Sequence, residues 1–201
     1  MPFHLPVYIG INRIRQPNLA ISIPYVYGLM NSIAEKAIHN DILRVTRQLI
    51  QKSGYYENQK TEITGVFDLK TNERGVLSLT LEQYSYAGGA HGITYISGLT
   101  WDSSTGRLYR LDQLFKPGSN YVKVLSEMVA AQIKERSIMT IEPFTSIKPN
   151  QDYYIADKAL VLFFQLYDLA PYAYGFPYFP ISIYSIQDLI SEQSPLQKMF
   201  G

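Results

Sequence analysis

Alternating apolar and polar residues predict most of the strands of this chain, because a half-buried strand repeats with a period of two. In the first half, the predicted strands cover residues 7–11, 19–24, 61–70, 76–86, 93–102 and 107–110. Pro24 is expected to end the second of these strands, since proline cannot donate to a strand ladder. Short turns join the last four, so the sequence predicts an antiparallel meander there.

The second half of the chain contains three further predicted strands. They cover residues 152–155, 160–166 and 179–183. Residues 161–164 are all apolar and show no alternation, which predicts a strand buried on both faces.

Two stretches have the 3.6-residue period of amphipathic helices. The first covers residues 29–53, with Asn31 as its N-cap, Glu35 near its first turn and Gly54 after its last turn. The second covers residues 121–136. The apolar stripes are Ile38, Ile42, Val45 and Leu49 in the first, and Val122, Leu125, Met128, Val129 and Ile133 in the second.

Shorter helical features are expected at three capping residues. Ser119 is the expected N-cap of the second helix, Asp112 of a single turn over residues 111–115, and Ser185 of a turn over residues 185–190. The last residues, 191–201, show no pattern and are expected to be a frayed tail.

These elements predict an α+β fold, in which a mostly antiparallel sheet with a glycine-rich corner packs against two main helices. Residues 1–201 are expected to form a single domain. Within it, residues 19–60 supply a strand and the first helix, residues 61–190 the core, and residues 191–201 the tail.

The composition excludes several classes of function. The net charge is +1, so there is no basic excess for a nucleic acid. The absence of cysteine excludes a thiol nucleophile, a zinc–thiolate site and disulfides. The N-terminus lacks a basic region followed by an apolar run, and no apolar run is long enough to span a membrane. The sequence therefore predicts neither a signal peptide nor a membrane segment, and leaves the compartment open.

Tyrosine is abundant, with 17 residues. Tyrosine favours strands, which explains most of the scattered positions. It also favours binding surfaces, because its ring is apolar and its tip is polar.

The corner at residues 87–92 concentrates candidate residues. Gly88, Gly89 and Gly92 indicate an unusual backbone path, and Tyr84 and Tyr86 precede them. His91 lies inside the run. It is a candidate acid or base in a hydrolase, with partners to be supplied by Ser85, Asp152 or Asp168. The alternative is that His91 only hydrogen-bonds the end of a strand.

Metal and nucleotide sites are not indicated. His39 shares a helix face with Glu35, and the remaining histidine outside the corner is His4, so no set of metal ligands is complete. The glycines lack a phosphate-binding spacing and lead into a strand. No cofactor is expected.

The loop over residues 167–178 is the other candidate binding element, because it is long, aromatic and stiffened by prolines. Its alternative role is to fold back and close one end of the core. The candidate residues of this loop are Asp168, Pro171, Tyr172, Tyr174, Gly175 and Tyr178.

Several motifs together resemble a known family. They are Y-x-Y-x-G-G-A-H-G at residues 84–92, W-D-x-x-T-G at 101–106, L-x-x-L-F-K at 111–116 and A-P-Y-x-x-G at 170–175. They resemble the C-terminal extracytoplasmic domain of anti-sigma-V type regulators, which also occurs beside the catalytic domain of a peptidoglycan deacetylase. The resemblance covers roughly residues 19–190.

This resemblance implies a non-enzymatic domain of the bacterial cell envelope, located outside the cytoplasm. Its expected ligand is a protein such as lysozyme, or alternatively a cell-wall glycan. Two further alternatives remain: a hydrolase that uses His91, and a structural module without a ligand. Nothing in the sequence fixes the oligomeric state.

Overall fold

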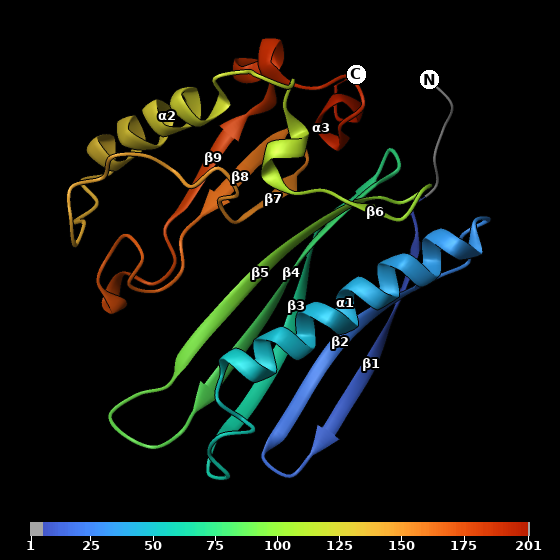
Figure 1. The fold of residues 1–201 in the computed structure, drawn as a ribbon, viewed down its shortest axis with the longest axis vertical. Helices are drawn as coiled ribbons and strands as arrows, with labels where there is room; N and C mark the ends of the chain where they lie inside the picture. Colours follow the sequence, from blue (N-terminus) through green and yellow to red (C-terminus); the bar gives the residue numbers. More distant parts are fainter. Residues whose placement is uncertain (1–5, 201) are drawn as a thin grey trace. The chain divides into compact units, whose positions relative to one another are not determined.

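A computed structural model describes residues 6–200. The chain forms two compact units that divide between Leu108 and Tyr109. Each unit has its own sheet and its own main helix (Figure 1). The α+β class with mostly antiparallel strands is therefore confirmed, with the strands shared between two sheets. The single domain expected from the sequence stays a prediction.

The first unit contains a six-stranded sheet in the order β1–β2–β3–β4–β5–β6. Its strands are β1 (Tyr8–Gln16), β2 (Leu19–Tyr27), β3 (Glu62–Glu73), β4 (Val76–Tyr86), β5 (Ile93–Asp102) and β6 (Arg107–Leu108). All neighbours are antiparallel except β2 and β3, which pair in parallel over three residue pairs. The parallel pair follows from the connection, because the chain leaves β2 and crosses through a helix before it returns as β3.

That helix, α1 (Ser32–Lys52), has the boundaries that its local signals predict. The side-chain oxygen of Asn31 accepts hydrogen bonds from the backbone N–H groups of Ile33 (3.1 Å) and Ala34 (3.2 Å). After the last turn, Gly54 takes a φ of +73°, a conformation that glycine reaches without a steric penalty. Both predicted helix ends are confirmed.

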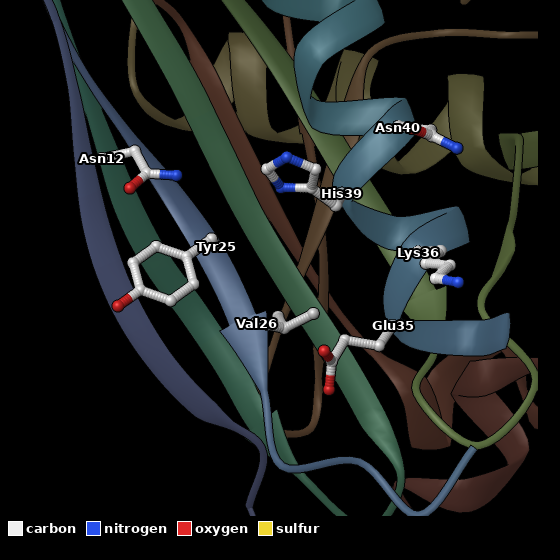
Figure 2. A pocket seen from close by; sticks show the side chains of 7 residues that line it. All are labelled: Asn12, Tyr25, Val26, Glu35, Lys36, His39 and Asn40. Carbon is white, nitrogen blue, oxygen red and sulfur yellow. The ribbon is translucent and has the colours of Figure 1, made fainter. Parts of the chain in front are cut away.

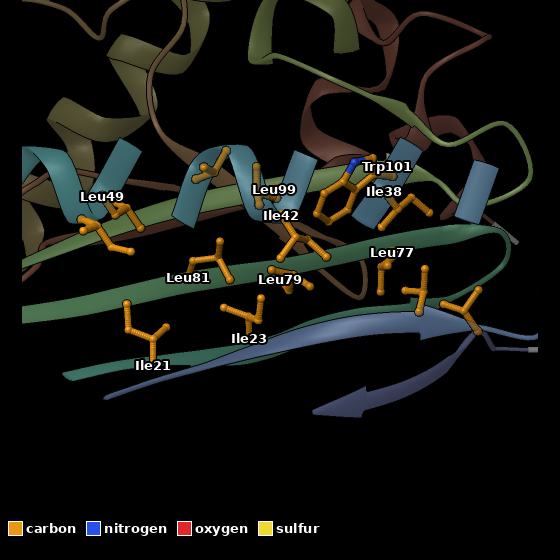
Figure 3. Close-up of a cluster of buried hydrophobic side chains, with 14 of the residues drawn as sticks. Ile21, Ile23, Ile38, Ile42, Leu49, Leu77, Leu79, Leu81, Leu99 and Trp101 are labelled. Carbon is orange, nitrogen blue, oxygen red and sulfur yellow. The ribbon is translucent and has the colours of Figure 1, made fainter. Parts of the chain in front are cut away.

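The core of the first unit lies between α1 and the sheet (Figure 3). Ile38, Ile42 and Leu49 of α1 point toward leucine and isoleucine side chains of β2, β4 and β5. Trp101 of β5 is fully buried among them. The helical stripe and the strand alternation thus supply the two faces of one core.

Pro24 does not end β2, contrary to the prediction. The strand continues to Tyr27, and Pro24 pairs with Ile11 of β1. On the other side of β2, β3 pairs only with residues 19–21. The segment around Pro24 therefore has one ladder partner, and a residue without N–H is tolerated there.

The second unit contains a three-stranded antiparallel sheet in the order β7 (Tyr153–Ala156), β8 (Ala159–Phe163) and β9 (Tyr178–Ser182). Residues 160–163 of β8 are all buried, as their unbroken apolar run predicted. Helix α2 (Tyr121–Glu135) contacts β9. Gln132 donates a hydrogen bond to the carbonyl oxygen of Pro180 at 2.9 Å, which links the helix to that strand.

Three capping predictions in this unit are wrong, each by one to three residues. The 3-10 turn η1 (Leu111–Leu114) starts after Arg110, and α2 starts after Asn120. The 3-10 helix η3 (Ile183–Leu189) starts after Ser182. Asp112, Ser119 and Ser185 are therefore not N-caps. Several adjacent residues can cap equally well, so the local signal does not choose among them.

The predicted frayed tail is also wrong. A short helix, α3 (Pro195–Lys198), forms there, and Leu196 and Met199 are fully buried. Phe115 forms an isolated bridge with Ile190, which ties this end of the chain to the segment after η1.

Candidate functional site

The corner between β4 and β5 has the special backbone path that its glycines predicted. Gly88 and Gly89 have φ values of +93° and +106°, which residues with side chains rarely adopt. The hydroxyl group of Tyr86 donates a hydrogen bond to the carbonyl oxygen of Gly89 at 2.9 Å. The conformation of this turn thus depends on two glycines and one tyrosine of the same segment.

Gly92 has a different role in this corner. A Cβ atom at this position would collide with the carbonyl oxygen of Ser85 and with the ring of Tyr84. The absence of a side chain therefore allows the tyrosine ring to cover the backbone at the start of β5. Tyr84 itself stays exposed on the surface of the sheet.

His91 is exposed, and its Nδ1 atom lies 2.9 Å from the carbonyl oxygen of Gly92. The partners that a hydrolase would need make other contacts. Ser85 donates to the carbonyl oxygen of Ile93 at 3.3 Å. Asp152 accepts from Gln165 at 2.8 Å, and Asp168 pairs with Lys148 at 3.1 Å. Within the first unit, the hydroxyl of Ser85 is therefore not paired with His91 as a nucleophile would be.

The loop between β8 and β9 has a buried base. Leu169 and Ala170 are buried, and the carbonyl oxygen of Leu169 accepts a hydrogen bond from the N–H of Ile141 at 2.9 Å. Tyr167, just before this base, has a φ of +68°, which is uncommon for a residue with a side chain. Its side chain is 49% exposed. The loop therefore holds this ring outward from a fixed position.

The tyrosines of this loop fall into two groups. The rings of Tyr167 and Tyr172 lie 5.7 Å apart, and Tyr174 is exposed beside them in the 3-10 turn η2 (Tyr172–Tyr174). Arg136 of α2 donates to the hydroxyl of Tyr174 at 3.4 Å. Tyr178 is the first residue of β9, is half-buried and packs against Phe163. Some rings of this loop thus face outward and others pack against the core, and its role as a binding element stays a prediction.

Two backbone features complete the loop. Pro171, which is exposed, precedes η2, and Gly175 follows it with a φ of +77°. The glycine allows the chain to reverse toward β9 after a single helical turn.

A groove of about 230 Å³ adjoins this loop. Its walls are residues 141–148 on one side and residues 164–169 on the other, with Gln151 at one end. The rings of Phe144 and Phe164 meet edge to face at 6.1 Å, and the Lys148–Asp168 ion pair lies at the rim. The sequence pattern did not single out Tyr167, Phe144 or Lys148. The available signal for Phe144 was its place after Pro143 in an irregular segment.

A second groove, of about 380 Å³, lies in the first unit between the β1–β2 hairpin and the first turns of α1 (Figure 2). Its walls include Glu35 and His39, the helix pair noted in the sequence. Among residues 6–200, no group of three histidine, aspartate or glutamate residues is placed to hold a metal ion. His4 lies outside the described residues.

Within the described part of the chain, no helix is both long and apolar enough to cross a membrane. The longest helix, α1, is amphipathic and covers the sheet of the first unit.

Two protein families match separate parts of the chain. Residues 112–184 match the family described as "Protein of unknown function (DUF3298)", and residues 16–94 match the family described as "Deacetylase PdaC". The resemblance expected from the sequence motifs is confirmed: the chain is homologous to anti-sigma-V and PdaC-type proteins and carries a DUF3298 region. This homology supports a regulatory or binding domain.

Two curated relatives are from Bacillus subtilis. The chain is 26% identical to the anti-sigma-V factor RsiV over 189 residues, which is 87% of this chain and 66% of that protein. It is 20% identical to the peptidoglycan-N-acetylmuramic acid deacetylase PdaC over 190 residues, which is 88% of this chain and 39% of that protein. The chain thus spans just under two thirds of one relative and well under half of the other.

Two crystal structures have the same fold. A DUF3298 family member from Bacteroides fragilis matches with a TM-score of 0.72 and 14% identity, over 96% of this chain and 97% of that one. A DUF3298 family protein from Pseudomonas aeruginosa matches with a TM-score of 0.65 and 15% identity, over 100% of this chain and 97% of that one. At these identities the likeness concerns the fold.

Proposed function

We propose that this chain is a non-catalytic, extracytoplasmic binding domain of the bacterial cell envelope, and that its ligand is a protein such as lysozyme. The surface that binds is formed by residues 164–178 and the facing segment 141–148. The observation that carries the proposal is the exposure of Tyr167 and Tyr174 above a buried base, with the half-buried ring of Tyr172 lying 5.7 Å from that of Tyr167.

The composition of this surface is that of a protein interface. Such interfaces place aromatic residues at the centre and charged groups at the rim. Here Tyr167 lines the groove, and the Lys148–Asp168 pair and Glu142 border it. Homology to an anti-sigma factor supports a protein partner, because proteins of that name act on another protein.

The absence of catalysis is supported by the corner at residues 87–92. His91 is its only side chain suited to proton transfer, and the hydroxyl of Ser85, in the same unit, donates to the carbonyl oxygen of Ile93 instead. The location outside the cytoplasm is supported by the anti-sigma-V relative.

A wall glycan is the second candidate ligand for the same loop. It is supported by the name of the deacetylase relative and by tyrosine rings that lie beside polar side chains, such as the Tyr174–Arg136 contact. Candidate residues for either ligand also include the corner tyrosines Tyr84 and Tyr86.

Calorimetric titration with hen lysozyme and with soluble peptidoglycan fragments tests the proposal. Tyr167→Ala is expected to weaken lysozyme binding at least tenfold, which corresponds to about 1.4 kcal/mol. Tyr184→Ala is the matched control, because this tyrosine has the same exposed fraction, 49%, on a different element of the same unit.

Three outcomes are informative. Lysozyme binding that is lost in Tyr167→Ala and kept in Tyr184→Ala supports the protein ligand. If only peptidoglycan fragments bind, and this binding is lost in Tyr167→Ala and kept in Tyr184→Ala, the ligand of the loop is a glycan. Binding of neither ligand, or equal binding by both variants, contradicts the proposal.

A further inference from the structure

The groove of the first unit is lined mainly by polar side chains and by one aromatic ring, that of Tyr25 (Figure 2). Two strands and one helix supply them: Asn12 comes from β1, Tyr25 from β2, and Glu35, Lys36, His39 and Asn40 from α1. None of these residues belongs to the loop surface of the second unit, so the groove is a separate feature.

The polar groups of this groove are not used by the fold. Among residues 6–200, the side chains of Asn12, Lys36, His39 and Asn40 make no hydrogen bond or ion pair, and neither does the hydroxyl of Tyr25. Glu35 uses one oxygen, Oε2, to accept from the N–H of Leu29 at 3.2 Å. Its other oxygen has no partner in the described chain. Convergent donors and acceptors in a concave site are the usual mark of a ligand pocket.

The ring of Tyr25 is positioned by a glycine. Gly10 and Tyr25 are register partners on β1 and β2, and a Cβ atom on Gly10 would collide with the ring. The ring therefore lies over the bare backbone of Gly10, and Figure 2 shows it nearly face-on in the groove. The ring thus rests on the strand and is half-buried where it lines the groove.

Two further rings extend this platform along the hairpin. The Tyr25 and Tyr27 rings lie 5.7 Å apart, and the Tyr27 and Tyr8 rings stack at 5.5 Å. The strands set the spacing of these rings. Tyr25 and Tyr27 are two residues apart on β2 and so share a face of the sheet, and Tyr8 is the register partner of Tyr27 on β1. Tyr27 is 45% exposed and Tyr8 61% exposed. The result is a continuous row of three rings that begins in the groove.

We propose that this groove and its tyrosine row form a binding site for an oligosaccharide of uncharged sugars. The apolar C–H face of a sugar ring stacks on Tyr25, and the next sugars along the chain meet Tyr27 and Tyr8. The amides of Asn12 and Asn40 bind hydroxyl or acetamido groups at the edge of the first sugar.

The charges of the groove agree with a neutral ligand. Glu35 and Lys36 carry opposite charges, so the lining does not favour a phosphate or a polyanion. A repeating row of rings also fits a ligand that itself repeats. This site lies beyond the proposed protein-binding function and uses a different part of the chain.

Titration of the full chain with chitotetraose and with cellotetraose, followed by calorimetry and by NMR of the tyrosine rings, tests the site. Gly10→Ala is the sharpest variant. Its φ lies outside the left-handed region, so alanine suits the strand backbone, and the new methyl group displaces only the far end of the Tyr25 side chain. Saccharide affinity is expected to fall at least tenfold in this variant and in Tyr25→Ala.

Tyr56→Ala is the matched control, because Tyr56 is an exposed tyrosine of the same unit outside the groove. Tyr56→Ala and Tyr167→Ala are both expected to bind the saccharides with the affinity of the wild type. Lysozyme binding is expected to be unchanged in Gly10→Ala, which separates this site from the loop surface. Failure of both tetrasaccharides to bind at millimolar concentration overturns the proposal, and so does binding that survives Gly10→Ala and Tyr25→Ala.

Discussion

The indole nitrogen of Trp101 donates a hydrogen bond to Oδ2 of Asp41 across 3.1 Å. Trp101 lies on β5 and Asp41 on α1, 60 residues earlier in the chain. The indole is fully buried, so this N–H has no access to water as a substitute acceptor. This polar contact thus links the helix to the sheet at a defined position.

Removal of the acceptor should destabilise the first unit. Asp41→Ala leaves the buried indole N–H unpaired and is expected to lower the free energy of unfolding by about 1–3 kcal/mol. Asp41→Asn keeps an acceptor and should cost less. Urea unfolding followed by fluorescence measures both, because Trp101 is the only tryptophan and reports on this unit.

Arg44→Ala is the control for this change. It removes only the exposed ion pair between Arg44 and Oδ1 of Asp41, at 2.7 Å, and should cost less than about 1 kcal/mol. Equal losses in Arg44→Ala and Asp41→Ala would show that the indole hydrogen bond contributes nothing to stability.

Gly106 and Gly54 provide a matched pair of glycines, both with a φ of +73°. At Gly54, a Cβ atom would have its nearest neighbour 4.0 Å away, whereas at Gly106 it would lie 2.7 Å from backbone atoms of Ala34. Gly54→Ala is expected to cost about 1–2 kcal/mol from its conformation alone. Gly106→Ala should add about 1–3 kcal/mol of overpacking against α1. The same fluorescence-detected unfolding measures both, and equal costs would rule out the contact with the helix.

Ser126 of α2 holds the irregular segment 137–151. Its Oγ accepts a hydrogen bond from the N–H of Ile147 at 3.0 Å, and Ile147 is 2% exposed. Ser126→Ala should cost about 1–3 kcal/mol, because it leaves this buried N–H without a partner. Hydrogen exchange at the Ile147 amide is expected to accelerate accordingly. Ser185→Ala removes only a surface hydroxyl, which donates to the carbonyl oxygen of Ser182, and serves as the control. Unchanged protection of Ile147 in Ser126→Ala would refute this role.

Tyr121 gives the second unit a pH dependence at alkaline pH. Burial, and then the negative charge of Asp112, raise the pKa of Tyr121 above its usual value of about 10. Its ring stacks on Phe115 at 4.6 Å, and its hydroxyl donates to the carbonyl oxygen of Pro149 at 2.9 Å. The unfolded chain therefore releases this proton at a lower pH than the folded chain.

Tyr121 contributes fully to stability at any pH below its pKa in the unfolded chain. The contribution is lost as the pH rises from that value through the higher pKa of Tyr121 in the folded chain. Tyr121→Phe should have a flatter profile of unfolding free energy against pH above about pH 10. Its ultraviolet titration should lack one late tyrosine ionisation. Identical alkaline profiles for the two proteins would contradict the raised pKa.

Elements with local signals were predictable from the sequence. Asn31 and Gly54 mark both ends of α1, because a capping side chain and a positive φ depend on adjacent residues only. The turn after β5 was equally clear. Oδ1 of Asp102 accepts from the N–H groups of Ser104 and Thr105, which is the reason that aspartate favours such turns.

Features that depend on distant residues were not predictable. The parallel pairing of β2 with β3 involves three residue pairs, too few to leave a pattern in either strand. The tail is ordered by the burial of Leu196 and Met199, which tertiary packing alone decides. The division of the strands between two sheets likewise has no local mark.

The candidate sites follow the same rule. The composition of residues 167–178 pointed to Tyr172 and Tyr174, because prolines and aromatics in a loop are visible in the sequence. The outward placement of Tyr167 depends on its φ of +68°, and the residue type tyrosine does not predict such a value. Gly10 appeared to be an ordinary strand residue in the sequence. Its role is to leave space for the ring of Tyr25, its register partner 15 positions later.

The short parallel pairing of β2 and β3 has a consequence for the order in which the molecule opens. Three residue pairs, two hydrogen bonds between Val7 and Asn72, and the contact with α1 hold the β1–β2 hairpin in place, whereas the β3–β4 and β4–β5 ladders are long. Amide protons of the hairpin should therefore exchange through a partial unfolding that leaves the meander intact. Tyr8, Tyr25 and Tyr27 belong to this hairpin. A ligand bound between the hairpin and α1 would therefore slow the exchange of the hairpin's amide protons.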